Sequence, residues 1–328
     1  MNNYQINCRL NTDELFMRRC LQLARNGFQN ACPNPMVGAV VVHNGRILGE
    51  GYHVRCGEGH AEVNALASVL PEDEPLLKES TIYVSLEPCA HYGKTPPCAR
   101  LIVEKGLKRC VVGCVDPFSK VQGRGIGILR DAGIEVTVGV LEDECKALNK
   151  PFMTYHSLHR PYITLKWAQT ADGFIGRTGQ TPDTPLIISN PLTSILCHKR
   201  RAEHQAILVG RNTVLSDRPS LNVRHWSGPN PLRVVLGHSP VEGYDALYVS
   251  SAEEAVGTLY EQGIQSLLVE GGSQTLQTFI DHDLWDEAYV ETGDMTIGDG
   301  VKAPVLKNEI AVSTQCYEKN TLTSFKHI

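Results

Sequence analysis

The first 150 residues alternate between helix-like and strand-like patterns of apolar positions. Residues 13–26 carry apolar side chains at helical spacing, with Thr12 or Asp13 as the candidate N-cap and Gly27 after the end. The run 37–43 predicts a strand, and Asn44-Gly45 predicts a hairpin turn into a second strand at 47–52. The same patterns predict helices at 60–70, 97–105, 125–132 and 142–149 and strands at 81–86, 109–115 and 134–138. Strands that alternate with helices indicate an α/β sandwich.

A change of pattern after residue 150 divides the chain. Residues 150–160 show no clear period, and Pro161 opens a new strand at 162–167. We therefore predict two domains, 1–150 and 151–328, which suits a chain of 328 residues. The second half again predicts helices at 193–202, 252–262 and 276–282 and strands at 206–210, 232–236, 266–270 and 287–292, with a polar loop after residue 210.

Composition is that of an ordinary globular chain. Apolar residues make up 42% and charged residues 20%, which excludes a disordered or collagen-like chain. No apolar run approaches the ~18 residues of a membrane span. The polar N-terminus has no apolar signal core, so we expect a cytoplasmic protein. The net charge of −5 argues against a large nucleic-acid footprint, which usually needs a basic patch.

Cysteine is unusually frequent and unevenly placed. There are 11, and all but Cys197 and Cys316 precede residue 150. Without a secretory signal, a disulfide framework is a poor interpretation. We expect a minority of these thiols to bind metal or do chemistry, and the rest to be small buried apolar residues.

The strongest chemical signal is a set of metal-binding residue types. His60-Ala61-Glu62 is followed by Pro88-Cys89 and then by Cys98. One imidazole and two thiolates suit zinc, and three protein ligands leave the fourth position for water. Zinc lowers the pKa of that water, and Glu62 lies close enough in sequence to pass its proton to a leaving amine. The order H-x-E, P-C, C is the pattern of the zinc deaminases.

Two other interpretations of these residues stay open. A structural zinc site would need a fourth protein ligand, for which Cys56, His53 and His91 are the candidates. Alternatively, His60, Cys89 and Cys98 are unrelated core residues.

The spacing of the cysteines points to one family. Eight residues separate Cys89 from Cys98, within the segment E-P-C-A-H-Y-G-K-T-P-P-C. This segment, with Asn34-Pro35-Met36-Val37-Gly38 and Gly51-Tyr52-His53, resembles the deaminase half of the bifunctional riboflavin-biosynthesis deaminase/reductase family over about residues 10–140. The resemblance implies a cytidine-deaminase-like α/β/α sandwich. It also implies zinc ligands at His60, Cys89 and Cys98, a proton shuttle at Glu62, and pyrimidine and ribose-phosphate contacts at Asn34, His53 and Lys94.

A glycine-rich segment, Gly123 to Gly127, partly imitates a dinucleotide fingerprint. Its third glycine is one position early for G-x-G-x-x-G, and no acidic residue is placed to suit it. We interpret it as a loop-to-helix turn near the substrate phosphate. Just before it, the family carries Asp-Pro-Asn-Pro where this chain has Asp116-Pro117-Phe118-Ser119.

The second half resembles the reductase half of the same family, which implies a dihydrofolate-reductase-like α/β domain. The resemblance lies in residues 160–173, 210–224 and 269–273, the last being a strand, a glycine turn and a helix start that suits phosphate binding. It implies NADPH contacts at Ala168, Thr213, Asp217, Gly272, Ser273, Gln274, Thr275, Leu276, Gln277 and Thr278. It implies substrate contacts at Arg201, Leu221, Arg224 and Glu270. The chain departs from the family at 179–189, where the family's Trp is absent.

Taken together, the sequence predicts a two-step enzyme that uses zinc and NADPH. Its first domain would deaminate a phosphoribosylated diaminopyrimidinone, and its second would reduce the ribose to a ribityl phosphate. The alternatives are a nucleoside or nucleic-acid deaminase with a C-terminal binding module, and a zinc-stabilised scaffold without activity. We expect a small-molecule substrate, no nucleic-acid or membrane partner, and a homo-oligomer as one option.

Overall fold

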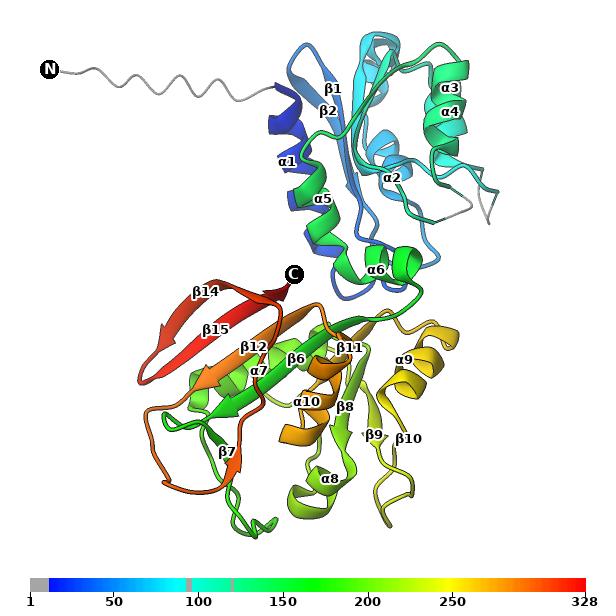
Figure 1. The fold of residues 1–328 in the computed structure, drawn as a ribbon. Helices are drawn as coiled ribbons and strands as arrows, with labels where there is room; N and C mark the ends of the chain where they lie inside the picture. The colour runs from blue at the N-terminus through cyan, green and yellow to red at the C-terminus, as the bar shows by residue number, and fades with distance from the viewer. Residues whose placement is uncertain (1–11, 93–95, 119–120) are drawn as a thin grey trace, which may run out of the picture. The chain divides into compact units, whose positions relative to one another are not determined.

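The computed structural model describes residues 12–92, 96–118 and 121–328, and the chain divides into two compact units between Leu158 and His159 (Figure 1). Both units are α/β, as the sequence predicted. The helix α6 (Lys150–Leu158) belongs to the first unit, whereas the sequence boundary at residue 150 assigned it to the second.

The first unit is built on a five-stranded sheet with strand order β2-β1-β3-β4-β5. β1 is antiparallel to β2 and β3, and β3, β4 and β5 are parallel to one another. The strands are β1 (Gly38–His43), β2 (Arg46–Tyr52), β3 (Thr81–Leu86), β4 (Arg109–Cys114) and β5 (Glu135–Val138). The helices are α1 (Thr12–Ala24), α2 (Ala61–Ala67), α3 (Cys98–Glu104), α4 (Arg124–Asp131), α5 (Glu142–Leu148) and α6, with 3₁₀ turns η1 (Arg25–Gly27) and η2 (Pro71–Glu79).

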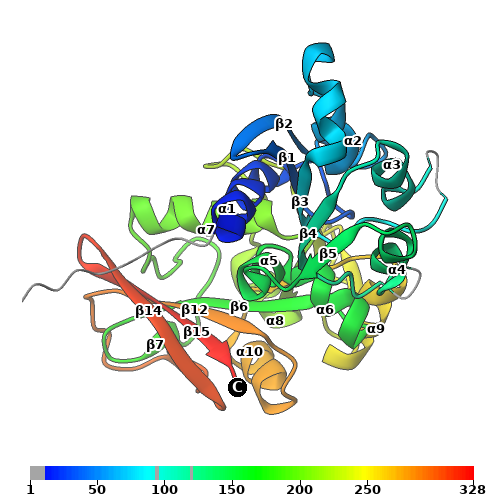
Figure 2. The same cartoon turned by 90° about the horizontal axis from the view of Figure 1, so that it is seen from above.

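Alternation along the strands explains why helices cover both faces of this sheet. Val40 and Val42 pack against α1, whereas Ala39 and Val41 pack in a separate cluster with α2 and α3. Figure 2 shows α1 and α5 on one side of the sheet and α2, α3 and α4 on the other. The first unit is therefore an α/β/α sandwich, which confirms the predicted fold class.

The second unit is built on an eight-stranded sheet with order β10-β9-β8-β11-β6-β12-β15-β14. Its strands are parallel from β10 to β12, and the C-terminal hairpin β14–β15 joins antiparallel to β12. The strands are β6 (Tyr162–Gln169), β8 (Ala206–Gly210), β9 (Leu232–Leu236), β10 (Leu247–Val249), β11 (Ser266–Val269), β12 (Glu287–Thr292), β14 (Glu309–Tyr317) and β15 (Asn320–His327). β7 (Phe174–Gly176) and β13 (Val301–Lys302) pair separately, and the helices are α7 (Pro191–Glu203), α8 (Arg211–Asp217), α9 (Ala252–Glu261) and α10 (Ser273–Asp281).

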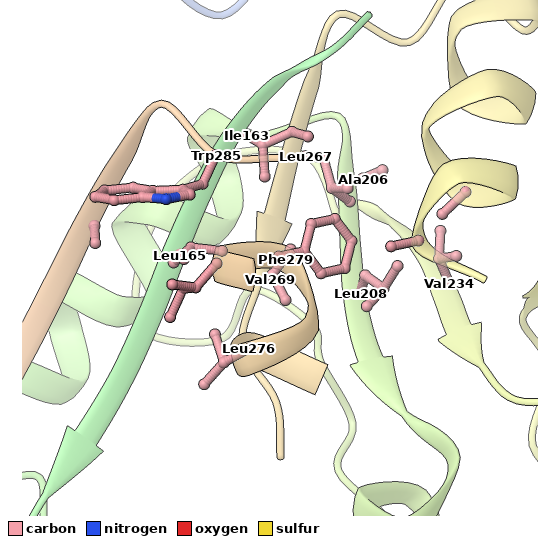
Figure 3. Close-up of a cluster of buried hydrophobic side chains, with 14 of the residues drawn as sticks. Ile163, Leu165, Ala206, Leu208, Val234, Leu267, Val269, Leu276, Phe279 and Trp285 are labelled. Carbon is pink, nitrogen blue, oxygen red and sulfur yellow. The ribbon is translucent and has the colours of Figure 1, made fainter. Parts of the chain in front are cut away.

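The largest core of the second unit lies between the sheet and the helices α9 and α10. Ile163 and Leu165 of β6 and Leu208 of β8 meet Phe279 of α10 there, and all four are fully buried (Figure 3). On the opposite face, Ile207 and Val209 join Val214 of α8 in a smaller cluster. Continuous apolar runs such as 206–209 are typical of parallel strands buried on both faces.

Three of the segments that differ from the sequence prediction share one reason. Residues 150–158 form α6, in which only Phe152 is buried. Residues 211–217 form α8 instead of a polar loop, and only Val214 is buried. The hairpin β14–β15 was not predicted, because β14 is exposed along nearly its whole length. A segment with few buried side chains has no regular spacing of apolar residues from which its secondary structure could be predicted.

Two further features follow from the described residues. Each cysteine in that part of the chain is a free thiol. The expectation that the cysteines outside the metal cluster are buried is wrong for Cys32, Cys56 and Cys316, which are exposed. No helix found in those ranges has the length and apolar character needed to cross a bilayer.

Truncating Leu208 should destabilise the second unit alone. Leu208→Ala removes a fully buried side chain from the packed core, at a cost of about 2–5 kcal/mol. All three tryptophans, Trp167, Trp226 and Trp285, lie in the second unit. Tryptophan fluorescence during urea unfolding therefore reports that unit, and its midpoint should fall.

The matched control is Leu215→Ala, because Leu215 lies on α8 and is 48% exposed. Its midpoint should stay close to that of the unaltered protein, since an exposed truncation costs within about 0.5 kcal/mol. Equal shifts for the two variants would contradict the core described above.

Candidate active sites

Three metal-ligating side chains meet in the first unit. His60 is the residue before α2, Cys89 lies in the loop after β3, and Cys98 opens α3. His60 Nδ1 is 3.5 Å from Cys89 Sγ and 3.4 Å from Cys98 Sγ, and the ligand atoms all lie within 4.8 Å of one another. One nitrogen and two sulfurs at this spacing fit a zinc ion. The structure therefore brings together the three predicted ligands.

The surroundings favour a thiolate at this cluster. The pKa of the Cys89 thiol is lowered by hydrogen bonds from the Cys98 thiol and the His60 imidazole. The backbone N–H of Cys98 also donates to Cys89 Sγ at 3.3 Å. Because metals bind the thiolate form, these groups prepare Cys89 for coordination.

Glu62 lies beside the ligands in the first turn of α2. Its side chain is only 3% exposed, and burial together with the nearby Cys89 raises its pKa to about 7. Such a carboxyl group can both accept and donate a proton near neutral pH. Its position and protonation suit the predicted shuttle.

No fourth protein ligand completes the cluster among the described residues, since the group of metal-ligating side chains found there contains His60, Cys89 and Cys98 alone. The alternative ligand His53 uses its ring nitrogens elsewhere, with Nδ1 3.2 Å from the carbonyl of Gly59 and Nε2 3.1 Å from Asn34 Nδ2. Neither Cys56 nor His91 joins the group. The donor set therefore leaves one coordination position open, as in catalytic zinc sites.

Two of the predicted substrate residues of this unit lie side by side. Asn34 and His53 are joined by the contact just described, and the His53 ring packs edge-on against His60 with centroids 5.4 Å apart. Burial lowers the pKa of His53, so its imidazole is neutral near pH 7. The third, Lys94, lies outside the described residues.

The glycine-rich segment forms the predicted loop-to-helix turn at the start of α4. The buried Glu87 carboxylate already accepts the backbone N–H groups of Asp116, Gly123, Gly125 and Ile126, at 3.3, 3.0, 2.9 and 3.2 Å. These backbone groups are therefore already satisfied by a side chain of the protein, and the expectation that the turn lies near the substrate phosphate stays a prediction. Glu87 ties α4 to the Pro88-Cys89 turn.

A cavity of about 1150 Å³ opens in the second unit at the carboxyl ends of β6, β8, β9 and β11. Crevices at this edge of a parallel sheet are common ligand sites. The predicted coenzyme residues that line it are Ala168, Thr213, Asp217 and, within the run 272–278, all but Gln277. The Gln277 amide instead donates to Asp281 and to the carbonyl of Val305.

The glycine turn between β11 and α10 lies inside this cavity. Gly272 has φ 56° and ψ 133°, a conformation that residues with a side chain rarely adopt. A Cβ at this position would approach Thr213 Oγ1 to 3.0 Å. The turn thus leaves the N-terminus of α10 open to a phosphate group.

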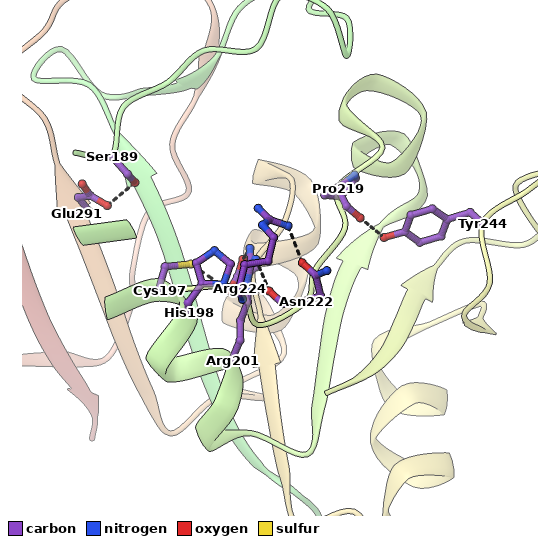
Figure 4. Close-up of polar contacts among 10 residues, drawn as sticks. Ser189, Cys197, His198, Arg201, Pro219, Asn222, Arg224, Tyr244 and Glu291 are labelled. Carbon is purple, nitrogen blue, oxygen red and sulfur yellow. Dashed lines mark hydrogen bonds and ion pairs between the residues drawn. The ribbon is translucent and has the colours of Figure 1, made fainter. Parts of the chain in front are cut away.

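Three of the predicted substrate residues of this unit, Arg201, Arg224 and Glu270, take part in hydrogen bonds, and Figure 4 shows Arg201 and Arg224 beside Asn222. Arg201 of α7 donates to the Glu270 carboxylate at 2.9 and 2.6 Å, and to the carbonyl of Asn222 at 3.2 Å. Glu270 lines the cavity, whereas Leu221 is buried beside a separate cavity of about 300 Å³. The exposed Arg224 is held through its backbone N–H, which donates to His198 Nδ1 at 3.1 Å.

Sequence reasoning missed two residues here. Lys166 of β6 lines the cavity; burial alone would lower its pKa, but Cys197, Glu270 and Glu291 raise it, so it stays charged. A lysine within an otherwise apolar strand was the available signal. His198 gave no signal, because only its contact with the 221–224 segment shows its role.

The divergent segment 179–189 nevertheless forms part of the cavity wall. Gln180 Nε2 donates to Asp217 Oδ1 at 2.9 Å. Ser189 Oγ donates to the buried Glu291 carboxylate at 2.6 Å. These two hydrogen bonds hold residues 179–189 in the cavity wall, although the chain lacks the family's Trp there.

Comparison with known proteins places both units. Residues 10–114 match the family model of the cytidine and deoxycytidylate deaminase zinc-binding region, and residues 161–327 match that of the RibD C-terminal domain. The riboflavin biosynthesis protein RibD of Aquifex aeolicus is 38% identical, over 88% of this chain and 89% of its own. RibD of Bacillus amyloliquefaciens is 36% identical, over 90% and 87%.

Solved structures agree over nearly the whole chain. A Thermotoga maritima diaminohydroxyphosphoribosylaminopyrimidine deaminase/5-amino-6-(5-phosphoribosylamino)uracil reductase has a TM-score of 0.85 and 35% identity, covering 97% of this chain and 99% of its own. Acinetobacter baumannii RibD has a TM-score of 0.85 and 29% identity, covering 96% and 98%. With the metal cluster in one unit and the lined cavity in the other, the chain belongs to the RibD family of riboflavin biosynthesis proteins.

Proposed function

We propose that this chain catalyses two successive steps of riboflavin biosynthesis. The first is hydrolytic deamination of diaminohydroxyphosphoribosylaminopyrimidine, and the second is NADPH-dependent reduction of 5-amino-6-(5-phosphoribosylamino)uracil at its ribose. The T. maritima relative is named as a deaminase of the first compound and a reductase of the second. The observation that carries the proposal is the pairing of an open His60, Cys89 and Cys98 cluster beside Glu62 with a separate cavity built around a glycine turn. The match of the second unit to the RibD C-terminal domain supports a reductase in preference to a binding module.

In the first unit, His60, Cys89 and Cys98 would hold zinc, which when bound lowers the pKa of a coordinated water. Glu62 takes a proton from the attacking water and delivers it to the leaving amine nitrogen, because its raised pKa lets it exchange protons near neutral pH. Asn34 and neutral His53 orient the pyrimidine, and Lys94 would bind its ribose phosphate.

In the second unit, the Gly272 turn would receive the pyrophosphate of NADPH at the N-terminus of α10, and Ala168 would lie beside the nicotinamide. NADPH supplies the hydride, and the protein orients the two reactants. The Arg201 ion pair outweighs the effect of burial and lowers the pKa of Glu270, so this carboxyl carries no proton to donate. Charged Lys166 is the cavity group placed to donate one to the opening ribose.

The remaining predicted contacts complete the substrate site. Arg201 fixes both Glu270 and the 221–224 segment, which carries Leu221 and the exposed guanidinium of Arg224. Arg224 is suited to bind the substrate phosphate. The proposal includes no nucleic-acid partner, because a net charge of −5 provides no basic footprint.

Removing the proton shuttle should stop the first step alone. Glu62→Gln keeps the shape of the side chain but cannot exchange the proton, so ammonia release should fall by about 100-fold or more. Zinc content, and NADPH oxidation with the deaminated pyrimidine supplied directly, should not change. Ammonia release within tenfold of the unaltered protein would show that Glu62 is not the shuttle.

Filling the glycine turn should impair the second step alone. Gly272→Ala places a Cβ on a conformation that disfavours one and near Thr213, so the KM for NADPH should rise by about tenfold. Ammonia release should be unaffected.

Gly257→Ala is the matched control, because this glycine of α9 has open space around its Cβ position. It should leave both activities unchanged. The glycine turn would have no part in coenzyme binding if Gly272→Ala kept the original KM.

A further inference from the structure

Arg211 is a charged side chain of the large cavity that the proposed reaction leaves unused. It is the first residue of α8 and lines the cavity where β8 ends. Its Nε donates to the carbonyl oxygen of Ser239 at 3.1 Å. Across the described ranges no carboxylate forms an ion pair with it, so its charge is available to a ligand.

The neighbouring strand end fixes the position of this side chain. Gly237 follows β9, and a Cβ there would lie only 2.6 Å from the Cβ of Arg211. The glycine therefore lets the stem of Arg211 lie directly against the chain after β9. Together with the bond to Ser239, this close packing holds the guanidinium at the β8–β9 end of the cavity.

The strand order indicates which part of a dinucleotide reaches Arg211. The cavity crosses the ends of β9, β8, β11 and β6, which are neighbours in that order. The Gly272 turn follows β11, and Ala168 of β6 and Glu270 line the side of the cavity where the proposed coenzyme and substrate would meet. A coenzyme with its pyrophosphate at Gly272 and its nicotinamide towards β6 would have its adenosine half over β8 and β9.

The chemistry of this end suits an additional phosphate. Sites selective for NAD usually place a carboxylate against the ribose 2′-hydroxyl, whereas sites for NADP place an arginine against the 2′-phosphate. After β9 the cavity is lined by Gly237, His238 and Ser239, and Arg211 faces the same end. The other arginine of the cavity, Arg177, follows β7 in the segment after β6 and so belongs to the nicotinamide side.

We propose that Arg211 makes the reductase select NADPH over NADH by binding the 2′-phosphate of the adenosine ribose. The inference rests on the proposed reductase function and names the residue that determines its coenzyme specificity. A guanidinium forms paired, charge-assisted hydrogen bonds with a phosphate, and NADH lacks that phosphate.

The test compares Arg211→Gln with Arg218→Gln. Arg218 follows the same helix, donates to the carbonyl of Glu242 and does not line the cavity, so it controls for loss of one charge at α8. Titration calorimetry should show Arg211→Gln weakening NADP⁺ and 2′,5′-ADP binding by about 10-fold or more, with NAD⁺ and 5′-AMP within about twofold. Arg218→Gln should change none of these, and Arg211→Lys should recover part of the loss.

Steady-state rates of coenzyme oxidation, measured with the deaminated pyrimidine as substrate, should show the same selectivity as the binding data. The ratio of kcat/KM for NADPH to that for NADH should fall by about tenfold in Arg211→Gln. An unchanged ratio, or equal losses for both coenzymes, would overturn the role of Arg211. Failure of the unaltered protein to oxidise either coenzyme would instead overturn the proposed function itself.

Discussion

The chemistry of the first unit depends on bringing one imidazole nitrogen and two sulfurs within 4.8 Å of one another. These atoms come from the start of α2, the loop after β3 and the start of α3, so their meeting requires both helices to pack on the same face of the sheet. Buried small residues, Ala61 and Ala65 of α2 and Ala99 of α3, allow that close approach. Glu87, next to the Pro88-Cys89 turn, accepts three backbone N–H groups at the start of α4 and that of Asp116 after β4, which holds the turn in place. The ligand cluster is therefore a consequence of packing, and a metal ion would strengthen it.

Two buried glutamates show how environment assigns opposite tasks to one residue type. Burial and the nearby Cys89 raise the pKa of Glu62 to about 7, although His60 acts in the opposite direction, so this carboxyl group can carry a proton. The Glu270 side chain is also nearly buried, at 6% exposed, but it is paired with Arg201. This ion pair lowers the pKa of Glu270, so the carboxyl group remains an anion. Its charge in turn keeps Lys166 protonated in the same cavity. The two environments thus suit proton exchange at Glu62 and a fixed negative charge at Glu270.

The sequence predicts the features that depend on local residue type and spacing, and it misses those that depend on contacts between distant segments. The zinc ligands, Glu62 and the glycine turn at Gly272 are visible because spacing and residue type alone define them. The buried strands are visible because their apolar runs are continuous. By contrast, α8 and β14 bury too little to show a period. His198 and Glu87 act through backbone groups distant in sequence, so no pattern reveals them. The turn at Gly123 was predicted, but the carboxyl group that accepts its N–H, Glu87, lies 36 residues earlier and gave no signal.

The central claim is that His60, Cys89 and Cys98 hold one zinc ion with a position left for water. X-ray absorption at the zinc edge, on protein with its zinc content measured, tests this directly. The account predicts one zinc per chain with two sulfur neighbours at about 2.3 Å and two nitrogen or oxygen neighbours at about 2.0–2.1 Å, one of them exchangeable with added cyanide. A zinc coordinated by three or four sulfurs, or one that cyanide cannot reach, would contradict it.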